Sequence, residues 1–202
     1  MAGAPLPGGP QHASMACMIP LTAQSGPGSA VRFPREIAAA VTLPAAAAAL
    51  VAPGRADLST AAATAVVTAC GALAPRMALV PFIAAQGTPD PRSIRVFDPF
   101  ADPTPPALHG FGPAPDRARV RLAGDRCADA WRVWRAQDGP FDGSSGAAGS
   151  LSLGAWCAWA LGSWARAETR ARYALETRAD DPLAGLVLRS VVAGSGPSWE
   201  RR

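Results

Sequence analysis

The sequence contains no lysine and no asparagine, and all 19 of its basic residues are arginines. Without lysine the chain has no P-loop phosphate grip, no Schiff-base anchor for a cofactor and no Ser–Lys dyad. Without asparagine it has no acceptor for N-glycosylation and no left-handed turn built on that residue. Alanine supplies 46 of the 202 residues. Because lysine and asparagine share A-rich codons, this composition indicates a very GC-rich genome more than a function.

Patterns for metal binding and catalysis are also missing. The cysteines Cys17, Cys70, Cys127 and Cys157 are 53, 57 and 30 residues apart, and the chain has only two histidines. This spacing predicts no zinc site and favours reduced thiols that act as small hydrophobic side chains in a cytoplasmic protein. The sequence has no nucleophile elbow, zinc-protease motif, dinucleotide-binding motif or calcium loop. We therefore expect no catalytic residue, no metal and no cofactor.

Composition bounds the class of protein. An apolar content of 49% with 17% charged residues is typical of a folded chain, and the length suits one domain with a long tail. The formal net charge of +4 indicates only a mild affinity for anionic partners. Residues 1–30 are rich in proline, glycine and serine and lack the pattern of a secretory signal, which predicts a disordered tail.

Three parts are expected after this tail, and the expected fold class is mainly α. Residues 31–86 are typical of an Ala-rich helical segment, in which Asp57 or Ser59 caps a helix. Residues 87–115 contain eight prolines and predict a linker, and residues 116–199 predict a second helical domain. One or two short strands are expected near residues 77–97, where Pro81 would place a strand at the edge of a sheet.

Residues 151–182 predict an antiparallel helical hairpin. Ser150 would cap its first helix, after a flexible connector at 143–149, and the short turn at Gly162 requires the next helix to run back along it. The hairpin resembles a tetratricopeptide unit, whose small positions correspond to Ala155, Ala167 and Ala174 and whose closing Asp-Pro corresponds to Asp181–Pro182. Only one such unit is found, and a peptide-binding array needs about three or more.

The C-terminal sequence carries a further set of matches in order along the chain. These are Ala158–Trp159, Gly162, Ala174–Leu175, Asp181–Pro182, Leu183–Ala184 and Pro197–Ser198–Trp199. Over roughly 129–199 the chain thereby resembles an actinobacterial family, the domain of unknown function 4192. The resemblance implies an actinobacterial source, consistent with the GC-rich composition, and it implies no activity and no catalytic position.

Arginines cluster in a helix expected from Asp116 to Gln137. Five of them are candidate contacts for an anionic partner, namely Arg117, Arg119, Arg121, Arg132 and Arg135. Trp131 and Trp134 lie beside the last two, and arginine with aromatic side chains can bind phosphates and stack on bases. Aspartates are interleaved through the same stretch, so a solvated amphipathic helix is the competing interpretation.

These features favour a non-catalytic protein–protein interaction or scaffolding protein with an unidentified protein partner. The arginine cluster leaves open an Arg-dependent nucleic-acid-binding or regulatory module. Residues 58–75 and 143–165 are uncharged and leave open a membrane-associated helical protein. Both stretches consist largely of alanine, glycine, serine and threonine, which favour a buried helix over a membrane span.

Overall fold

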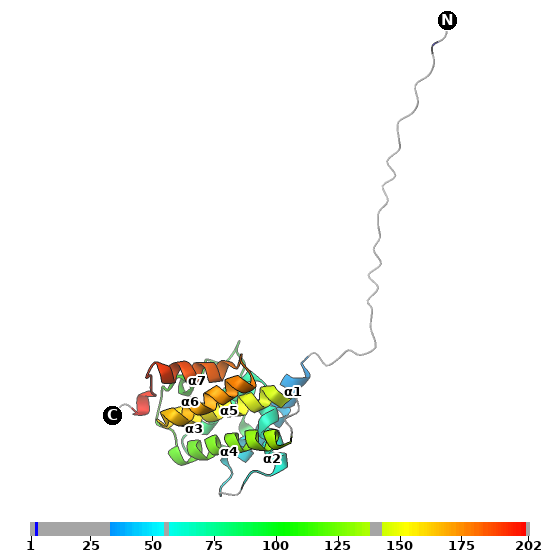
Figure 1. Cartoon of the computed structure of the whole chain (residues 1–202). Coiled ribbons are helices and arrows are strands. Elements are labelled where there is room, and N and C mark those ends of the chain that lie inside the picture. The colour runs from blue at the N-terminus through cyan, green and yellow to red at the C-terminus, as the bar shows by residue number, and fades with distance from the viewer. Residues whose placement is uncertain (1–2, 4–32, 55–56, 138–142, 201–202) are drawn as a thin grey trace. The chain divides into compact units, whose positions relative to one another are not determined.

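Helices form the regular structure of this chain (Figure 1). A computed structural model describes residue 3 and residues 33–54, 57–137 and 143–200, and the tail expected at 1–30 lies outside the described residues except for residue 3. The α-helices are α1 (Pro34–Val51), α2 (Thr60–Ala69), α3 (Leu73–Ala84), α4 (Arg117–Ala136), α5 (Ser144–Ala160), α6 (Trp164–Thr177) and α7 (Pro182–Val192). The 3₁₀ helices are η1 (Pro91–Ser93), η2 (Pro106–His109) and η4 (Ser198–Glu200). The mainly α fold class is confirmed.

Helix α5 lies at the centre of the bundle. It has no charged residue, so no part of its surface must reach water, and it is buried from Gly146 to Ala160. It contacts α2, α3, α4, α6 and α7. In Figure 1, α4 and α6 lie on either side of α5, and α7 lies beside α6. The uncharged stretch around residues 143–165 is therefore a core helix.

The prediction of short strands near residues 77–97 is wrong, because the described residues contain no strand. Residues 73–84 form helix α3, and its residues Leu79, Val80 and Ile83 are fully buried. A short apolar run has the same appearance in a strand and in a helix that is buried on several sides. Pro81 lies inside the helix, where it leaves the carbonyl of Met77 without its usual helical donor.

The Pro-rich residues 87–115 do not separate two cores. Leu108 is buried in the main core, and Ile94, Val96 and Phe97 pack against it. Helices α1 and α2 contact α4 on the other side of this segment, and α2 also contacts α5. The described residues from Phe33 onward thus belong to one compact unit, in which the segments expected at 31–86 and 116–199 share a core.

Glycines in the expected connector before residue 150 bring two helices together. A Cβ on Gly146 would lie 2.1 Å from the carbonyl oxygen of Val67, and one on Gly149 would lie 2.1 Å from that of Cys70. Only glycine lets α5 pass so close to the backbone of α2 and its C-terminal cap. The prediction of a flexible connector at residues 143–149 is therefore wrong. Ser150, which was expected to cap the helix, lies inside α5.

The helical hairpin expected at 151–182 is confirmed. Gly162 has a φ of 71°, a left-handed conformation that ends α5. Its N–H donates to the carbonyl of Trp159 at 2.9 Å, and the N–H of Ser163 donates to that of Ala158 at 2.9 Å. This is a Schellman cap, which turns the chain directly into α6. The alanines at the α5–α6 contact, Ala155, Ala167, Ala171 and Ala174, have no exposed surface.

The helix starts expected at Ser59, Asp116 and Asp181 are also confirmed. Their side-chain oxygens accept backbone N–H groups in the first turns of α2, α4 and α7 at distances of 2.9–3.2 Å. Helix α4 is continuous through Gly124, where a Cβ would lie 2.8 Å from the Cβ of Cys157. Glycine therefore allows α4 and α5 to cross closely instead of breaking α4.

Three cysteine thiols lie in the core, as their apolar neighbours predict. Cys70, Cys127 and Cys157 are free and buried. Desolvation raises the pKa of Cys70 and of Cys157 to about 12, and it raises the pKa of Cys127 well above its usual range. These thiols therefore stay protonated at neutral pH, and a protonated buried thiol is a poor nucleophile.

We expect these three thiols to resist iodoacetamide in the native state of a Cys17→Ser variant and to react in denaturant, as counted by intact mass. Unfolded thiols ionise near pH ~8.5, whereas the folded state keeps their protons. The free energy of unfolding therefore keeps its full value below that pH. It falls by about 1.4 kcal/mol per thiol per pH unit as the pH rises from there toward the pKa of the folded state. Fast native labelling, or equal unfolding free energies at pH ~8 and ~10, would contradict this account.

Candidate functional site

The arginines predicted as an anion site do not all lie on one face of α4. At about 3.6 residues per turn, Arg117, Arg121, Arg132 and Arg135 share a face, whereas Arg119 lies nearly opposite. The side chain of Arg119 is only 9% exposed. It donates to the carbonyl of Gly87, and its Nη1 is buried without a hydrogen bond among the described residues. Arg119 therefore packs against the protein.

Two of the exposed arginines have carboxylate partners. Arg117 pairs with Glu200 of η4, and Arg132 pairs with Asp129 one turn earlier in α4. Arg117 also donates to the carbonyl of Leu161 at 3.4 Å. These contacts use much of the hydrogen-bonding capacity that a phosphate ligand would need.

Arg121 and Arg135 are the predicted residues that make no ion pair within the described residues. The guanidinium of Arg135 lies 5.2 Å from the centre of the Trp131 ring, a cation–π contact.

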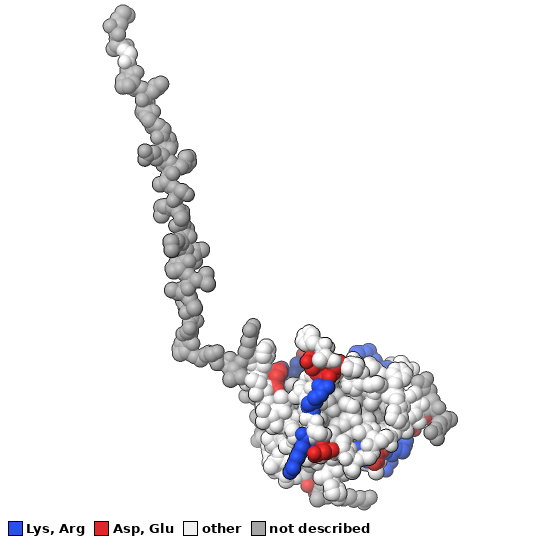
Figure 2. Space-filling model, turned by 180° about the vertical axis from the view of Figure 1, so that it is seen from behind, with Lys and Arg blue, Asp and Glu red and all other residues white. Residues whose placement is uncertain are grey.

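Figure 2 shows one face of the molecule, on which blue and red side chains lie next to one another in a mostly uncharged surface. The charge on this face is mixed in sign.

Another arginine of α4 completes the end of α1. Arg126 is buried, and its Nη1 and Nη2 donate to the carbonyls of Ala49 and Gly54 at 2.7 and 3.2 Å. The last carbonyls of a helix lack intrahelical partners. A guanidinium can donate to them, and its positive charge interacts favourably with the negative end of the helix dipole. Arg126 thus stabilises the packing of α1 on α4.

A buried ion pair joins α3, α5 and the start of α7. Nη1 of Arg76 lies 2.6 Å from Oδ2 of Asp181, and the side chains are 4% and 0% exposed. The same Nη1 donates to the hydroxyl of Ser152 at 2.9 Å, and Oδ1 of Asp181 accepts the N–H of Ala184. Sequence reasoning missed this pair, and the signal was a single arginine directly before the apolar run of residues 77–83.

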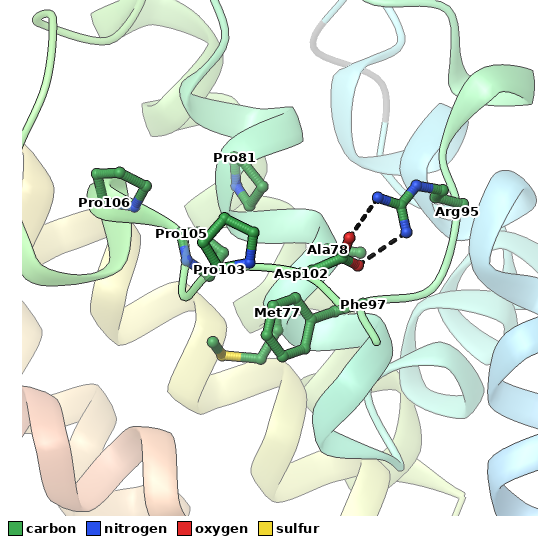
Figure 3. A pocket seen from close by; sticks show the side chains of 9 residues that line it. All are labelled: Met77, Ala78, Pro81, Arg95, Phe97, Asp102, Pro103, Pro105 and Pro106. Atoms are coloured by element: carbon green, nitrogen blue, oxygen red, sulfur yellow. Dashed lines mark hydrogen bonds and ion pairs between the residues drawn. The ribbon is translucent and has the colours of Figure 1, made fainter. Parts of the chain in front are cut away.

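A groove lies between α3 and the Pro-rich segment (Figure 3). Its volume is about 330 Å³. We call it the proline groove, and it is lined by Met77, Ala78, Pro81, Arg95, Phe97, Asp102, Pro103, Pro105 and Pro106. Figure 3 shows Phe97 against Met77, with the prolines toward one end and the Arg95–Asp102 pair toward the other. The groove is thus mainly apolar, with a charged pair at one end.

The Arg95–Asp102 pair shapes the loop beside the groove. Arg95 donates to both carboxylate oxygens of Asp102, at 2.8 and 2.5 Å. These bonds lower the pKa of Asp102 and raise that of Arg95. Asp102 also accepts the backbone N–H of Asp98 at 2.8 Å, and Asp98 accepts that of Phe100 at 2.9 Å. Phe100 is consequently held on an ordered turn.

Phe100 is 99% exposed, although its neighbour Phe97 packs against the core. Burying a phenylalanine side chain is favourable by about 1.5–3 kcal/mol, and this stabilisation is not realised in the isolated chain. Interpreting residues 87–115 as a linker concealed both the groove and this residue. The useful signal was the pair of phenylalanines within a segment otherwise dominated by proline.

Comparison with known proteins gives no match: no family model, no curated protein and no solved structure matches the chain. The resemblance to the domain of unknown function 4192 therefore stays a prediction, as does the tetratricopeptide-like character of the hairpin. The described residues contain no group of three or more side chains able to hold a metal ion. The function is therefore inferred from the arrangement of the side chains that the structure describes.

Proposed function

We propose that this chain is a non-catalytic protein–protein interaction protein and that its contact surface is the proline groove together with Phe100. The observation that carries the proposal is a fully exposed phenylalanine beside an apolar groove. Exposed apolar surface of this kind is typical of interaction sites. A rigid turn that presents an aromatic ring also lowers the entropy lost on binding.

The occupant that suits the groove is Phe100 of a second copy of the chain. A two-fold interface brings the same patch of both copies together, so a projecting side chain and a cavity in one patch can complement each other. Phe100 lies between Phe97 and Asp102, which both line the groove. The groove volume of about 330 Å³ is near the lower end for ligand pockets, about 300–1,000 Å³, and leaves room for an aromatic ring with adjacent atoms of its turn.

We expect a weak dimer, because two exchanged rings with their surroundings bury less than a standard interface of about 1,600 Å². Sedimentation velocity over a wide concentration range should show reversible dimerisation. Phe100→Ala should weaken it at least tenfold, since losing ~1.5 kcal/mol or more per ring corresponds to that factor.

Phe111→Ala is the matched control, because Phe111 is 56% exposed and lies outside the groove. It should leave the dimerisation constant unchanged. A wild-type chain that remains monomeric at the highest concentration, or equal effects of the two substitutions, would exclude the second copy as the occupant.

An Arg-dependent nucleic-acid-binding or regulatory module is the second candidate. Its support is the exposed Arg121 and the Arg135–Trp131 contact on α4. Binding through phosphates falls steeply with salt, so anisotropy of labelled mixed-sequence DNA and RNA at low and moderate salt tests it. Absence of binding at low salt removes this candidate.

A membrane-associated protein is the third candidate, and its support is α1. This helix is long and apolar enough to cross a bilayer, with a mean hydropathy of 1.3, and 28% of that stretch is buried. Phe33, Ile37 and Val41 are 60%, 52% and 76% exposed at helical spacing. Sedimentation with phosphatidylcholine vesicles tests this candidate, and an Ile37→Ser variant should lose binding if this face enters the lipid.

A further inference from the structure

Three arginines line a second cavity, at the start of α1 and α3 and the turn between α6 and α7. We call it the arginine pocket, and it is defined by Arg35, Arg76 and Arg178. Its volume is about 390 Å³. Glu36 also lines it, and each of the three arginines has a carboxylate partner, which is Glu36 for Arg35, Asp181 for Arg76 and Asp180 for Arg178. The cavity lies outside the predicted arginine cluster of α4.

Two of these guanidinium groups converge on one hydroxyl. Nη1 of Arg35 donates to Oγ of Ser145 at 3.2 Å, and Nη1 of Arg178 donates to the same oxygen at 2.7 Å. The two Nη1 atoms therefore lie within about 6 Å of each other, and each guanidinium also has its own carboxylate partner. An anion would give both Nη1 donors charge-assisted hydrogen bonds, which are stronger than those to a neutral hydroxyl.

The carboxylates near the pocket occupy other N–H groups of the same arginines. Glu36 accepts from Nη2 of Arg35 at 3.2 Å, and Asp180 accepts from Nε and Nη2 of Arg178. Asp181 pairs with Nη1 of Arg76. The Nη1 groups of Arg35 and Arg178 thus meet at Ser145, which does not line the pocket, and an anion in the pocket would draw these donors away from the hydroxyl.

The first turn of α3 adds a partial positive charge to the same wall. Its N-cap residue, Ala72, provides no side-chain hydrogen bond, and Leu73 and Ala74 supply the free N–H groups of this turn beside the pocket, whereas Pro75 has none. Unsatisfied N–H groups at a helix start attract anions. Leu73 is 44% exposed, so an apolar surface lies beside these donors.

We propose that the arginine pocket binds the phosphate group of a small anionic molecule whose apolar part lies against Leu73, Pro75 and Val96. Arg35 and Arg178 bind the anionic group between them. The 390 Å³ volume is sufficient for such a molecule, since ligand pockets span about 300–1,000 Å³. The proposal is independent of the proline groove.

The test uses inorganic phosphate and phenyl phosphate, titrated into the full chain at constant ionic strength with chloride as reference. Calorimetry and thermal shifts should show saturable binding of both, with phenyl phosphate the tighter because its ring reaches the apolar wall. Arg35→Gln and Arg178→Gln should each weaken binding at least tenfold. Glu36→Gln should tighten it, because it removes the carboxylate that competes for Arg35.

The matched control is Arg92→Gln, which removes the same charge from an exposed arginine outside the pocket and should leave the affinity unchanged. Thermal melts of each variant separate loss of binding from loss of fold, and Arg35 is suited to this because its side chain is 51% exposed. Phosphate binding no stronger than that of chloride, an equal loss in the Arg92 variant, or weaker binding after Glu36→Gln would each overturn the proposal.

Discussion

Replacing Gly149 with alanine is expected to lower the free energy of unfolding by about 3 kcal/mol, at the upper end of the usual cost of overpacking. The added Cβ would lie 2.1 Å from the carbonyl oxygen of Cys70 and 3.0 Å from its carbonyl carbon. These are backbone atoms, so no rotation of a side chain can relieve the overlap. Helix α5 must move away from α2, and that movement opens the core on both sides.

The same substitution in a helix with space around it should have the opposite sign. Gly185 lies within α7, and a Cβ there would meet only Nη1 of Arg189, at 3.3 Å, which is the end of a flexible side chain. Gly185→Ala is therefore expected to stabilise the protein by about 0.5–1 kcal/mol, the usual helix-propensity gain. Urea unfolding followed by circular dichroism measures both variants. A Gly149→Ala protein as stable as Gly185→Ala would contradict the close approach of α5 and α2.

The helices α2, α4, α6 and α7 could be predicted from the sequence because their start and end signals are local. Asp116 and Asp181 precede helices that they cap, and Gly162 lies two residues before α6, so the relevant pattern spans one helical turn. Hairpin geometry then follows from the short connection. These features require no knowledge of distant parts of the chain.

The glycines before residue 150 were misinterpreted because their role depends on α2. In sequence, a Gly- and Ser-rich stretch is typical of a flexible connector, and only the position of the Val67 and Cys70 carbonyls shows why glycine is required. The Pro-rich segment was misinterpreted in the same way. Its prolines predict irregular structure correctly, but its packing on α3 depends on residues such as Met77 that lie outside the segment.

Charge pairing was equally inaccessible to a local pattern. Arg117 pairs with Glu200, which is 83 residues away, and Arg76 pairs with Asp181, which is 105 residues away. A count of arginines in a helix therefore overestimates the charge available to a partner. It also overlooks isolated arginines such as Arg76, Arg35 and Arg178, which the fold brings to one pocket.

Asp181→Asn is expected to lower the free energy of unfolding by about 3–5 kcal/mol, the usual cost of removing one partner from a buried ion pair. The substitution preserves the helix start, because an asparagine oxygen can still accept the N–H of Ala184. What it removes is the negative charge 2.6 Å from Arg76, whose guanidinium is then buried without a charged partner. Chemical unfolding in urea measures the loss.

Asp116→Asn is the matched control, since it makes the same change at the helix start of α4, where the carboxylate is 47% exposed. Its expected effect is below about 1 kcal/mol, because Asp116 is half-exposed, so water screens its 3.4 Å contact with Arg119. Asp180→Asn provides a second comparison next to the buried residue, since its partner Arg178 and its own carboxylate both reach solvent. Equal losses in all three variants would mean that burial of the pair is unimportant.

A double-mutant cycle separates the interaction of Arg76 with Asp181 from the other effects of each substitution. Arg76→Met leaves Asp181 buried without its cation, and we expect it to cost about as much as Asp181→Asn. The double variant removes both charges and should be more stable than the sum of the single losses predicts, by about 2 kcal/mol or more. Additive losses would show that the two side chains contribute separately, through Ser152 and Ala184, instead of through their mutual contact. A large coupling would instead identify the Arg76–Asp181 contact as the interaction that fixes the start of α7 against α3.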